Sequence, residues 1–107
     1  MKLKNFKNNL ITGGAGDDTL TGGRGNDVFD FTVGFGNDVI TDFVVGTDKL
    51  KIKDAQGNIL TSTNLTDSTS GADLIITLGS DDITLEGLAT VTFDNTFLFL
   101  EINLHFR

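Results

Sequence analysis

Short apolar stretches separated by polar, glycine-containing turns recur along the first half of the chain. Their centres lie at Leu10-Ile11, Thr19-Leu20, Val28-Phe29 and Val39-Ile40. Apolar runs this short, bounded by turn residues, are typical of β-strands rather than of helices. The pattern therefore predicts very short strands joined by tight turns.

The second half of the chain carries longer apolar stretches. Strands are expected over residues 49–52, 74–78, 83–85 and 97–100. Gly79-Ser80-Asp81 is a turn signal that predicts a hairpin, and residues 56–58 (QGN) are another. The polar stretch 61–71 is expected to be a mobile loop, and residues 88–94 are expected to hold a helical turn. Together these features predict an all-β protein.

Two consecutive nine-residue units share the pattern Gly-Gly-x-Gly-x-Asp-x-apolar-x, in which x is any residue. They are residues 13–21 (GGAGDDTLT) and 22–30 (GGRGNDVFD). Glycine adopts positive φ and leaves backbone carbonyls uncovered, so each turn can direct several oxygens at one point. Asp18 and Asp27 add carboxylates. Oxygen ligands without nitrogen or sulfur favour Ca²⁺, and this nonapeptide is the repeat of calcium-binding parallel β-helices.

Weaker copies of the unit flank the two complete ones. Residues 33–41 (VGFGNDVIT) follow the insert Phe31-Thr32 and keep the second and third glycines and the aspartate. Residues 4–12 (KNFKNNLIT) stay in register without glycine, and Asn9 takes the place of the aspartate. Another degenerate turn contains Asp42 and Asp48. The alternative reading, a glycine-rich linker, does not explain an apolar residue at the strand position of each unit.

The tandem units resemble the RTX, or hemolysin-type, calcium-binding repeat family. Three later segments are similar to what closes and follows the repeats in serralysin-type secreted proteins: 36–50 (GNDVITDFVVGTDKL), 72–88 (ADLIITLGSDDITLEGL) and 95–100 (NTFLFL). The resemblance implies a single domain over residues 1–107. It would comprise a short parallel β-roll, a β-solenoid of nonapeptide repeats, over residues 4–53. A C-terminal antiparallel β cap and tail would follow over residues 54–107.

In a β-roll each repeat makes half a turn, so each repeat stacks on the one two positions later. The loop 13–18 is then expected over 34–38, and the loop 22–27 between the turn at Asn9 and the turn 42–48. Each pair of stacked loops is expected to hold a calcium ion. The expected ligands are Gly14, Gly16, Asp18, Gly34, Gly36 and Asp38 at the first site and Gly23, Gly25, Asp27, Asp42 and Asp48 at the second.

Alternatives stay open at this stage. Asp42 and Asp48 could cap turns instead of binding metal. A third site, between Asn9 and Asp27, is less favoured because asparagine is uncharged and the upstream turn has no glycine. Asp17 and the equivalent Asn26 are expected to support the loops rather than to bind the ion.

Composition excludes several classes of protein. The chain has no cysteine, which excludes disulfides and thiolate metal sites. Its net charge of −7 makes nucleic acid a poor partner, and no apolar run is long enough for a transmembrane helix. The negative charge is concentrated in residues 54–107, because residues 1–53 hold equal numbers of basic and acidic side chains.

The sequence does not point to an enzyme. It holds a single histidine, His105, and no HExxH or GxSxG motif. The resemblance implies a calcium module that stays unfolded at low calcium and folds outside the cell, as the C-terminal region of a bacterial protein exported by type I secretion. The N-terminus lacks the apolar run of a signal peptide, which fits export through a C-terminal signal.

The alternative role is structural. A β-roll with open ends could stack head-to-tail into calcium-stabilised filaments, since unpaired strand edges accept further strands. Residues 101–107 alternate apolar and polar side chains, and this tail is expected to form a strand within the domain or with a neighbouring copy.

Overall fold

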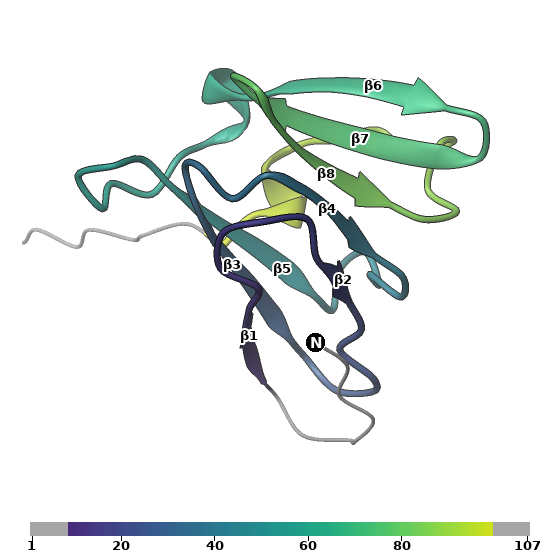
Figure 1. The fold of residues 1–107 in the computed structure, drawn as a ribbon. Coiled ribbons are helices and arrows are strands. Elements are labelled where there is room, and N and C mark those ends of the chain that lie inside the picture. The colour runs from purple at the N-terminus through teal and green to yellow at the C-terminus, as the bar shows by residue number, and fades with distance from the viewer. Residues whose placement is uncertain (1–8, 100–107) are drawn as a thin grey trace, which may run out of the picture.

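The computed structural model describes residues 9–99 of the 107-residue chain. The described part is built of strands and two 3₁₀ helices (Figure 1). The elements are β1 (Leu10–Thr12), β2 (Thr19–Leu20), β3 (Val28–Thr32), β4 (Asn37–Ile40), β5 (Lys49–Lys53), η1 (Ser62–Asn64), β6 (Thr66–Ser70), β7 (Asp73–Leu78), β8 (Asp81–Leu85) and η2 (Asn95–Phe97). The all-β prediction is confirmed. Within these residues, no helix has the length and hydrophobicity that a membrane crossing requires.

The first five strands alternate between two sheets. One sheet has the order β1-β3-β5 and is parallel throughout, and the other has the order β2-β4-β8-β7-β6. Strands two apart in the chain are therefore neighbours, with Ile11 opposite Phe29 and Leu20 opposite Ile40. The glycine turns between these strands consequently stack on one another.

The apolar position of each repeat points into the space between the sheets. Ile11, Leu20, Phe29 and Ile40 are all fully buried. Residues on either side of them in the strands are more exposed, as expected for strands with one buried face. The core continues into the C-terminal half through Phe43, whose ring stacks on a second phenylalanine, Phe97, with the centroids 5.6 Å apart.

The antiparallel strands of the C-terminal half extend a sheet of the repeats. β6, β7 and β8 pair antiparallel in sequence order, and β8 then pairs parallel with β4. Ile83 lies opposite Asp38 in that ladder, and Leu85 opposite Ile40. The expected antiparallel strands are present. They form one mixed five-stranded sheet with β2 and β4 instead of a purely parallel roll closed by a distinct cap.

Two local predictions are wrong. The stretch 61–71 is not a mobile loop, because it contains η1 and β6, and all five residues of β6 are exposed. A strand without a buried face leaves no hydrophobic alternation to detect. The single turn expected in 88–94 is present, since the Val91 amide donates to the Leu88 carbonyl at 3.1 Å, although the 3₁₀ helix of this region, η2, begins only at Asn95. The Asp94 side chain caps η2 by accepting a hydrogen bond from the Thr96 amide at 2.9 Å. Because η2 extends to Phe97, the strand expected over 97–100 does not begin at that residue.

Of that expected strand, Leu98 still forms a parallel bridge to Leu50. The strand expected in the tail 101–107 lies outside the described residues.

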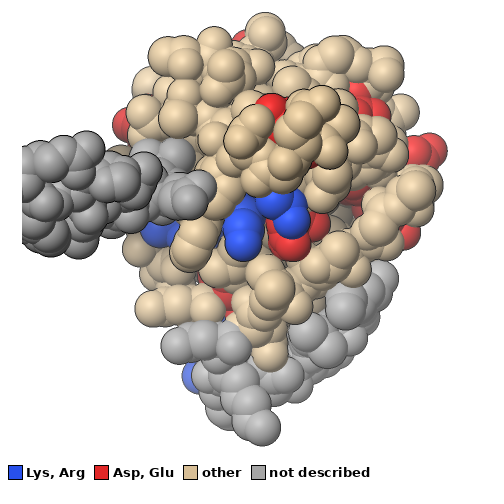
Figure 2. Space-filling view, turned by 90° about the vertical axis from the view of Figure 1, so that its left-hand side faces the viewer, with Lys and Arg blue, Asp and Glu red and all other residues tan. Residues whose placement is uncertain are grey.

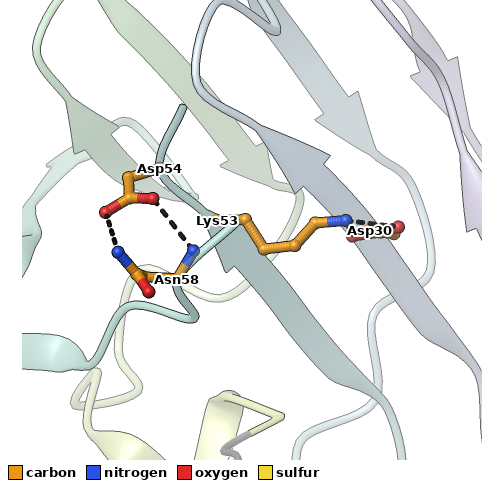
Figure 3. A network of polar contacts seen from close by, with 4 residues as sticks. All are labelled: Asp30, Lys53, Asp54 and Asn58. Carbon is orange, nitrogen blue, oxygen red and sulfur yellow. Dashed lines mark hydrogen bonds and ion pairs between the residues drawn. The ribbon is translucent and has the colours of Figure 1, made fainter. Parts of the chain in front are cut away.

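The lysines of β5 hold neighbouring segments against the outer face of the parallel sheet. Lys53 forms an ion pair with Asp30 of β3 at 3.3 Å, and Lys49 donates to the Thr96 carbonyl at 2.6 Å. Figure 2 shows basic side chains gathered beside acidic ones on this side of the molecule. Figure 3 shows Lys53 reaching Asp30, next to the expected turn at 56–58, where the Asp54 side chain accepts from Asn58.

Candidate calcium-binding loops

Each glycine turn contains two left-handed residues at the second and fourth positions of the repeat. Their φ angles are +80° at Gly14, +95° at Gly16, +81° at Gly23, +100° at Gly25, +92° at Gly34 and +87° at Gly36. No other residue type has positive φ in the described part of the chain. These positions require glycine because side chains with a Cβ rarely adopt this conformation.

The first glycine of each complete repeat is needed for a different reason. A Cβ at Gly13 would lie 2.7 Å from Oδ2 of Asp18, and a Cβ at Gly22 would lie 2.5 Å from Oδ2 of Asp27. Neither glycine is among the residues with positive φ. The first glycine therefore makes room for the carboxylate of its own repeat.

The loop 13–18 lies against the loop 34–38, as the repeat phase predicts. The Asp18 amide donates to Oδ1 of Asp38 at 2.7 Å, and the Asn37 amide donates to Oδ1 of Asp17 at 2.9 Å. A Cβ at Gly36 would lie 2.7 Å from the Gly16 carbonyl oxygen. The two loops are thus in close contact, and Asp17 supports the stack through its side chain.

The loop 22–27 lies between the two other turns, also as predicted. Oδ1 of Asp27 accepts from the backbone amide of Asn9 at 3.0 Å and from its side-chain amide at 3.2 Å. The Asp27 amide in turn donates to Oδ1 of Asp48 at 3.0 Å. In both stacks, the amide at the acidic position donates to the carboxylate at that position two repeats later.

Three carboxylate oxygens in these loops have no hydrogen-bond partner among the described residues. They are Oδ2 of Asp18, Asp27 and Asp38, and all three atoms are buried. Asp27 and Asp38 are each only 1% exposed. Leaving a buried anionic oxygen without a partner costs free energy, which a bound cation would remove.

Electrostatics at Asp38 favour a cation. The pKa of its carboxyl is raised to about 6, chiefly by burial; the hydrogen bond from the Asp18 amide opposes the shift, and the nearby charges of Asp18, Asp17 and Asp81 contribute to it. The carboxyl is thus held among other negative charges in a poorly hydrated place. Carboxylate and carbonyl oxygens are the donors that Ca²⁺ prefers, so the residues present fit that ion.

Asp42 and Asp48 make turn-capping contacts with both oxygens. Asp42 accepts from the amides of Gly22 and Gly23 at 3.0 and 2.8 Å. Asp48 accepts from the amide of Asp27 and, at 2.9 Å, from that of Val44. Burial raises the pKa of Asp48 as well. The capping alternative describes these contacts, and a metal-binding role for the two residues stays a prediction.

Sequence reasoning missed one residue of these loops, Asp81. It begins β8, is 7% exposed, and accepts from the amides of Gly34 and Gly36 at 2.7 and 3.2 Å. The sequence predicts only a hairpin turn here. The pairing of β8 with β4 brings Asp81 to a loop more than forty residues earlier in the chain, and no local signal reports such a contact.

Backbone atoms must supply part of any metal site in these loops. Within residues 9–99, no three side chains of the His, Cys, Asp or Glu type gather closely enough to hold an ion by themselves. A site between two stacked loops would combine one or two aspartates with backbone carbonyls of the glycine turns.

Comparison with known proteins agrees with this geometry. Residues 5–40 match the RTX calcium-binding nonapeptide repeat family, described as four copies. The resemblance to the RTX family is therefore confirmed, and this part of the chain carries RTX repeats. No curated protein matches the chain.

A solved structure shares the fold. It is the extracellular lipase LipA from Serratia marcescens, with a TM-score of 0.64 and 20% sequence identity. The match covers 91% of this chain and 20% of the lipase chain, so this chain spans about a fifth of the lipase's length. At this identity the likeness concerns the fold alone.

Proposed function

We propose that the chain is a single, non-catalytic module that folds as a short β-roll and binds calcium between its stacked glycine loops. The observation that carries the proposal is the set of unpaired, buried Oδ2 atoms of Asp18, Asp27 and Asp38. A protein that kept these loops free of cations would leave one buried oxygen of each of three carboxylates without a partner. The RTX repeats of residues 5–40 support the same reading.

The two stacks are unequal as calcium sites. The first combines Asp18 and Asp38, each with an unpaired oxygen, with the carbonyls of Gly14, Gly16, Gly34 and Gly36, of which the Gly36 carbonyl also accepts the Asp82 amide at 3.0 Å. The second has an unpaired oxygen only on Asp27, because both oxygens of Asp42 and Asp48 accept amides. We therefore propose a stronger site in the first stack and a weaker one in the second, with Gly23 and Gly25 contributing carbonyls.

The third site considered from the sequence, between Asn9 and Asp27, has the weakest support. The side-chain amide of Asn9 donates to Oδ1 of Asp27, so the asparagine already satisfies part of that carboxylate without a metal. A neutral residue also adds no charge to attract a cation. We propose two ions per chain.

Calcium would supply charge neutralisation, which this chain needs in order to fold. Aspartates crowd the stacked loops, and ordering many glycines is entropically costly. Binding and folding are then one process. A module of this kind stays poorly ordered at low calcium and folds where calcium is plentiful, which suits a secreted, extracellular bacterial protein exported by a type I apparatus. The structural likeness to an extracellular lipase is consistent with that location.

Calcium titration followed by circular dichroism tests the proposal. Extracellular calcium modules have dissociation constants of about 10⁻⁴ to 10⁻³ M. Millimolar calcium should therefore increase the β-sheet signal, and EGTA should reverse the change. Magnesium at the same concentration serves as the control, because it demands shorter bonds and stricter octahedral geometry. A spectrum that responds to neither calcium nor EGTA would refute the calcium function.

Head-to-tail filaments receive less support than a monomeric module. β1 and β2 end their sheets on the N-terminal side of the repeats. On the other side, β8 covers the edge of β4, and the edge of β5 is contacted by Leu98, Phe99 and Leu60 through a bridge and two backbone hydrogen bonds of 2.8 Å. A filament would need both sides free to pair.

A further inference from the structure

The C-terminal hairpin sends one carboxylate into the first calcium-binding stack. Asp81 lies at the start of β8, and its two oxygens each accept an amide of the loop 34–38. Its side chain is almost fully buried. Charge-assisted hydrogen bonds of this kind are stronger than neutral ones, so the contact holds the loop firmly.

Asp42 makes a related contact in the other stack. It accepts the amides of Gly22 and Gly23, at the first and second positions of the repeat, whereas Asp81 accepts those of Gly34 and Gly36, at the second and fourth. Backbone amides that converge around left-handed glycines form a concave, positive surface that suits an anion. Each of these two loops therefore uses an aspartate from outside its own repeat to fix the conformation of its glycines.

We propose that Asp81 is a positioning residue for the first calcium site and couples calcium binding there to docking of the β7–β8 hairpin. The inference rests on the calcium function proposed above. Asp81 fixes the backbone of Gly34 and Gly36, and the same loop ends at Asp38, whose Oδ2 is unpaired. The ladder between β4 and β8 begins at once, with Asn37 opposite Asp82.

The coupling works in both directions. A docked hairpin holds the loop 34–38 in the shape that aligns its carbonyls and Asp38 with the loop 13–18. Calcium bound between those loops holds the amides of Gly34 and Gly36 where Asp81 can accept them. Because binding free energies are linked, each event strengthens the other by the same factor. Docking of the β7–β8 hairpin would thereby depend on whether calcium occupies the first site.

Four variants of the full chain separate this role from general effects of charge or stability. Asp81→Asn and Asp81→Ala remove the charge or the whole acceptor. Asp81→Glu keeps the charge but displaces the oxygens. Asp82→Asn is the matched control, because Asp82 is the adjacent residue in β8 and loses the same charge, and its side chain accepts from the hydroxyl of Thr77 at 2.8 Å rather than from the loop. The Asp82 backbone amide, which donates to the Gly36 carbonyl at 3.0 Å, is kept in this variant.

Calorimetric calcium titration of the full chain should show one class of site weakened on the order of tenfold to a hundredfold in Asp81→Ala, the range expected for losing charged hydrogen bonds. Asp81→Asn should lose less because it keeps one acceptor oxygen. Asp81→Glu should resemble Asp81→Asn, whereas an effect of charge alone would leave it like the wild type. The second class of site and Asp82→Asn should stay within about twofold of the wild type.

Equal calcium binding by Asp81→Ala and Asp82→Asn would overturn the coupling, as would equal weakening of both classes of site. Amide hydrogen exchange at Gly34 and Gly36 gives a readout that does not depend on affinity. It should accelerate in Asp81→Ala while exchange in the β6–β7 ladder stays slow, and unchanged exchange would also overturn the proposal. Absence of calcium binding by the wild-type chain would instead refute the proposed function, while the exchange experiment would still test the contact of Asp81.

Discussion

At the residue scale, Asp18 and Asp38 hold equivalent positions in two stacked loops. Each has an unpaired, buried Oδ2, whereas Asp17 points to the backbone of the neighbouring loop. We expect Asp18→Ala and Asp38→Ala to weaken calcium-induced folding to a similar extent, by on the order of tenfold or more in affinity. Asp17→Ala should have a smaller effect, because it removes one exposed hydrogen bond and no ligand.

Calorimetric titration of these three variants decides between the assignments. All three variants remove one negative charge from the same stack. A difference in calcium affinity among them must therefore come from the position of the carboxylate and not from the change in net charge. An Asp17→Ala variant as impaired as the other two would mean that the repeat has been assigned in the wrong phase.

The raised pKa of Asp38 predicts a dependence on pH. In the metal-free protein the folded carboxyl titrates near 6, above its ordinary value of 3.8, so the folded state binds the proton more tightly than the unfolded state. Stability without metal should then fall as pH rises from about 4 to about 6. With calcium present, stability should instead rise with pH, because protons and the ion compete for the Asp38 carboxylate.

Apparent calcium affinity should therefore decline as pH drops below about 6. Calcium titrations at a series of pH values from about 5 to about 7.5 check this expectation, because this range spans the pKa of Asp38, about 6. The Asp38→Asn variant should lose most of the dependence while retaining the fold in excess calcium. A wild-type affinity that is flat across this range would contradict the assignment of Asp38 as a ligand.

At the scale of elements, close stacking of the loops can be tested through glycine. Gly36→Ala places a Cβ 2.7 Å from the Gly16 carbonyl and forces a residue with a side chain to φ +87°. Gly57→Ala is the matched control. Its φ is nearly the same, +85°, it lies outside the repeats, and a Cβ there meets no atom within 4 Å.

The control should lose about 1–2 kcal/mol of stability from the backbone conformation alone. Gly36→Ala should lose more than that, because the Gly16 backbone must also move, and should weaken calcium binding besides. Urea unfolding in saturating calcium measures both variants. Equal losses would show that the loops are less closely stacked than described.

The sequence predicts these loops better than it predicts the C-terminal half, for a physical reason. In the repeats, glycines with positive φ, a fixed aspartate and one buried apolar residue recur together, so local chemistry determines both the turn and its stacking. β6 carries only exposed Ser, Thr and Asp, and its pairing with β7 is the sole reason that it is a strand. The role of Asp81 likewise depends on the pairing of β8 with β4, which no local pattern encodes.

At the scale of the whole molecule, the strand edges decide how copies can meet. The edges of β4 and β5 that face away from β2 and β3 are occupied by β8 and by residues 59–60 and 98–99. β6, the far edge of the mixed sheet, has an entirely polar, exposed set of side chains. Edges that are covered or polar resist strand addition. β1 and β2 end their sheets on the N-terminal side of the repeats, so only that side is left for pairing. Head-to-tail growth needs two free sides, and we therefore expect the calcium-loaded chain to be monomeric rather than filamentous.

Light scattering coupled to size exclusion, in millimolar calcium and over a range of protein concentrations, tests this expectation. The mass should stay at the 11.5 kDa of one chain. A mass that rises with concentration would contradict it and point to the ends of the repeats. In that case association driven by charge should weaken as salt increases, because exposed charges are screened beyond about 8 Å at physiological ionic strength. Replacing Lys2, Lys4 and Lys7 by Glu, or deleting residues 101–107, would then identify which end takes part.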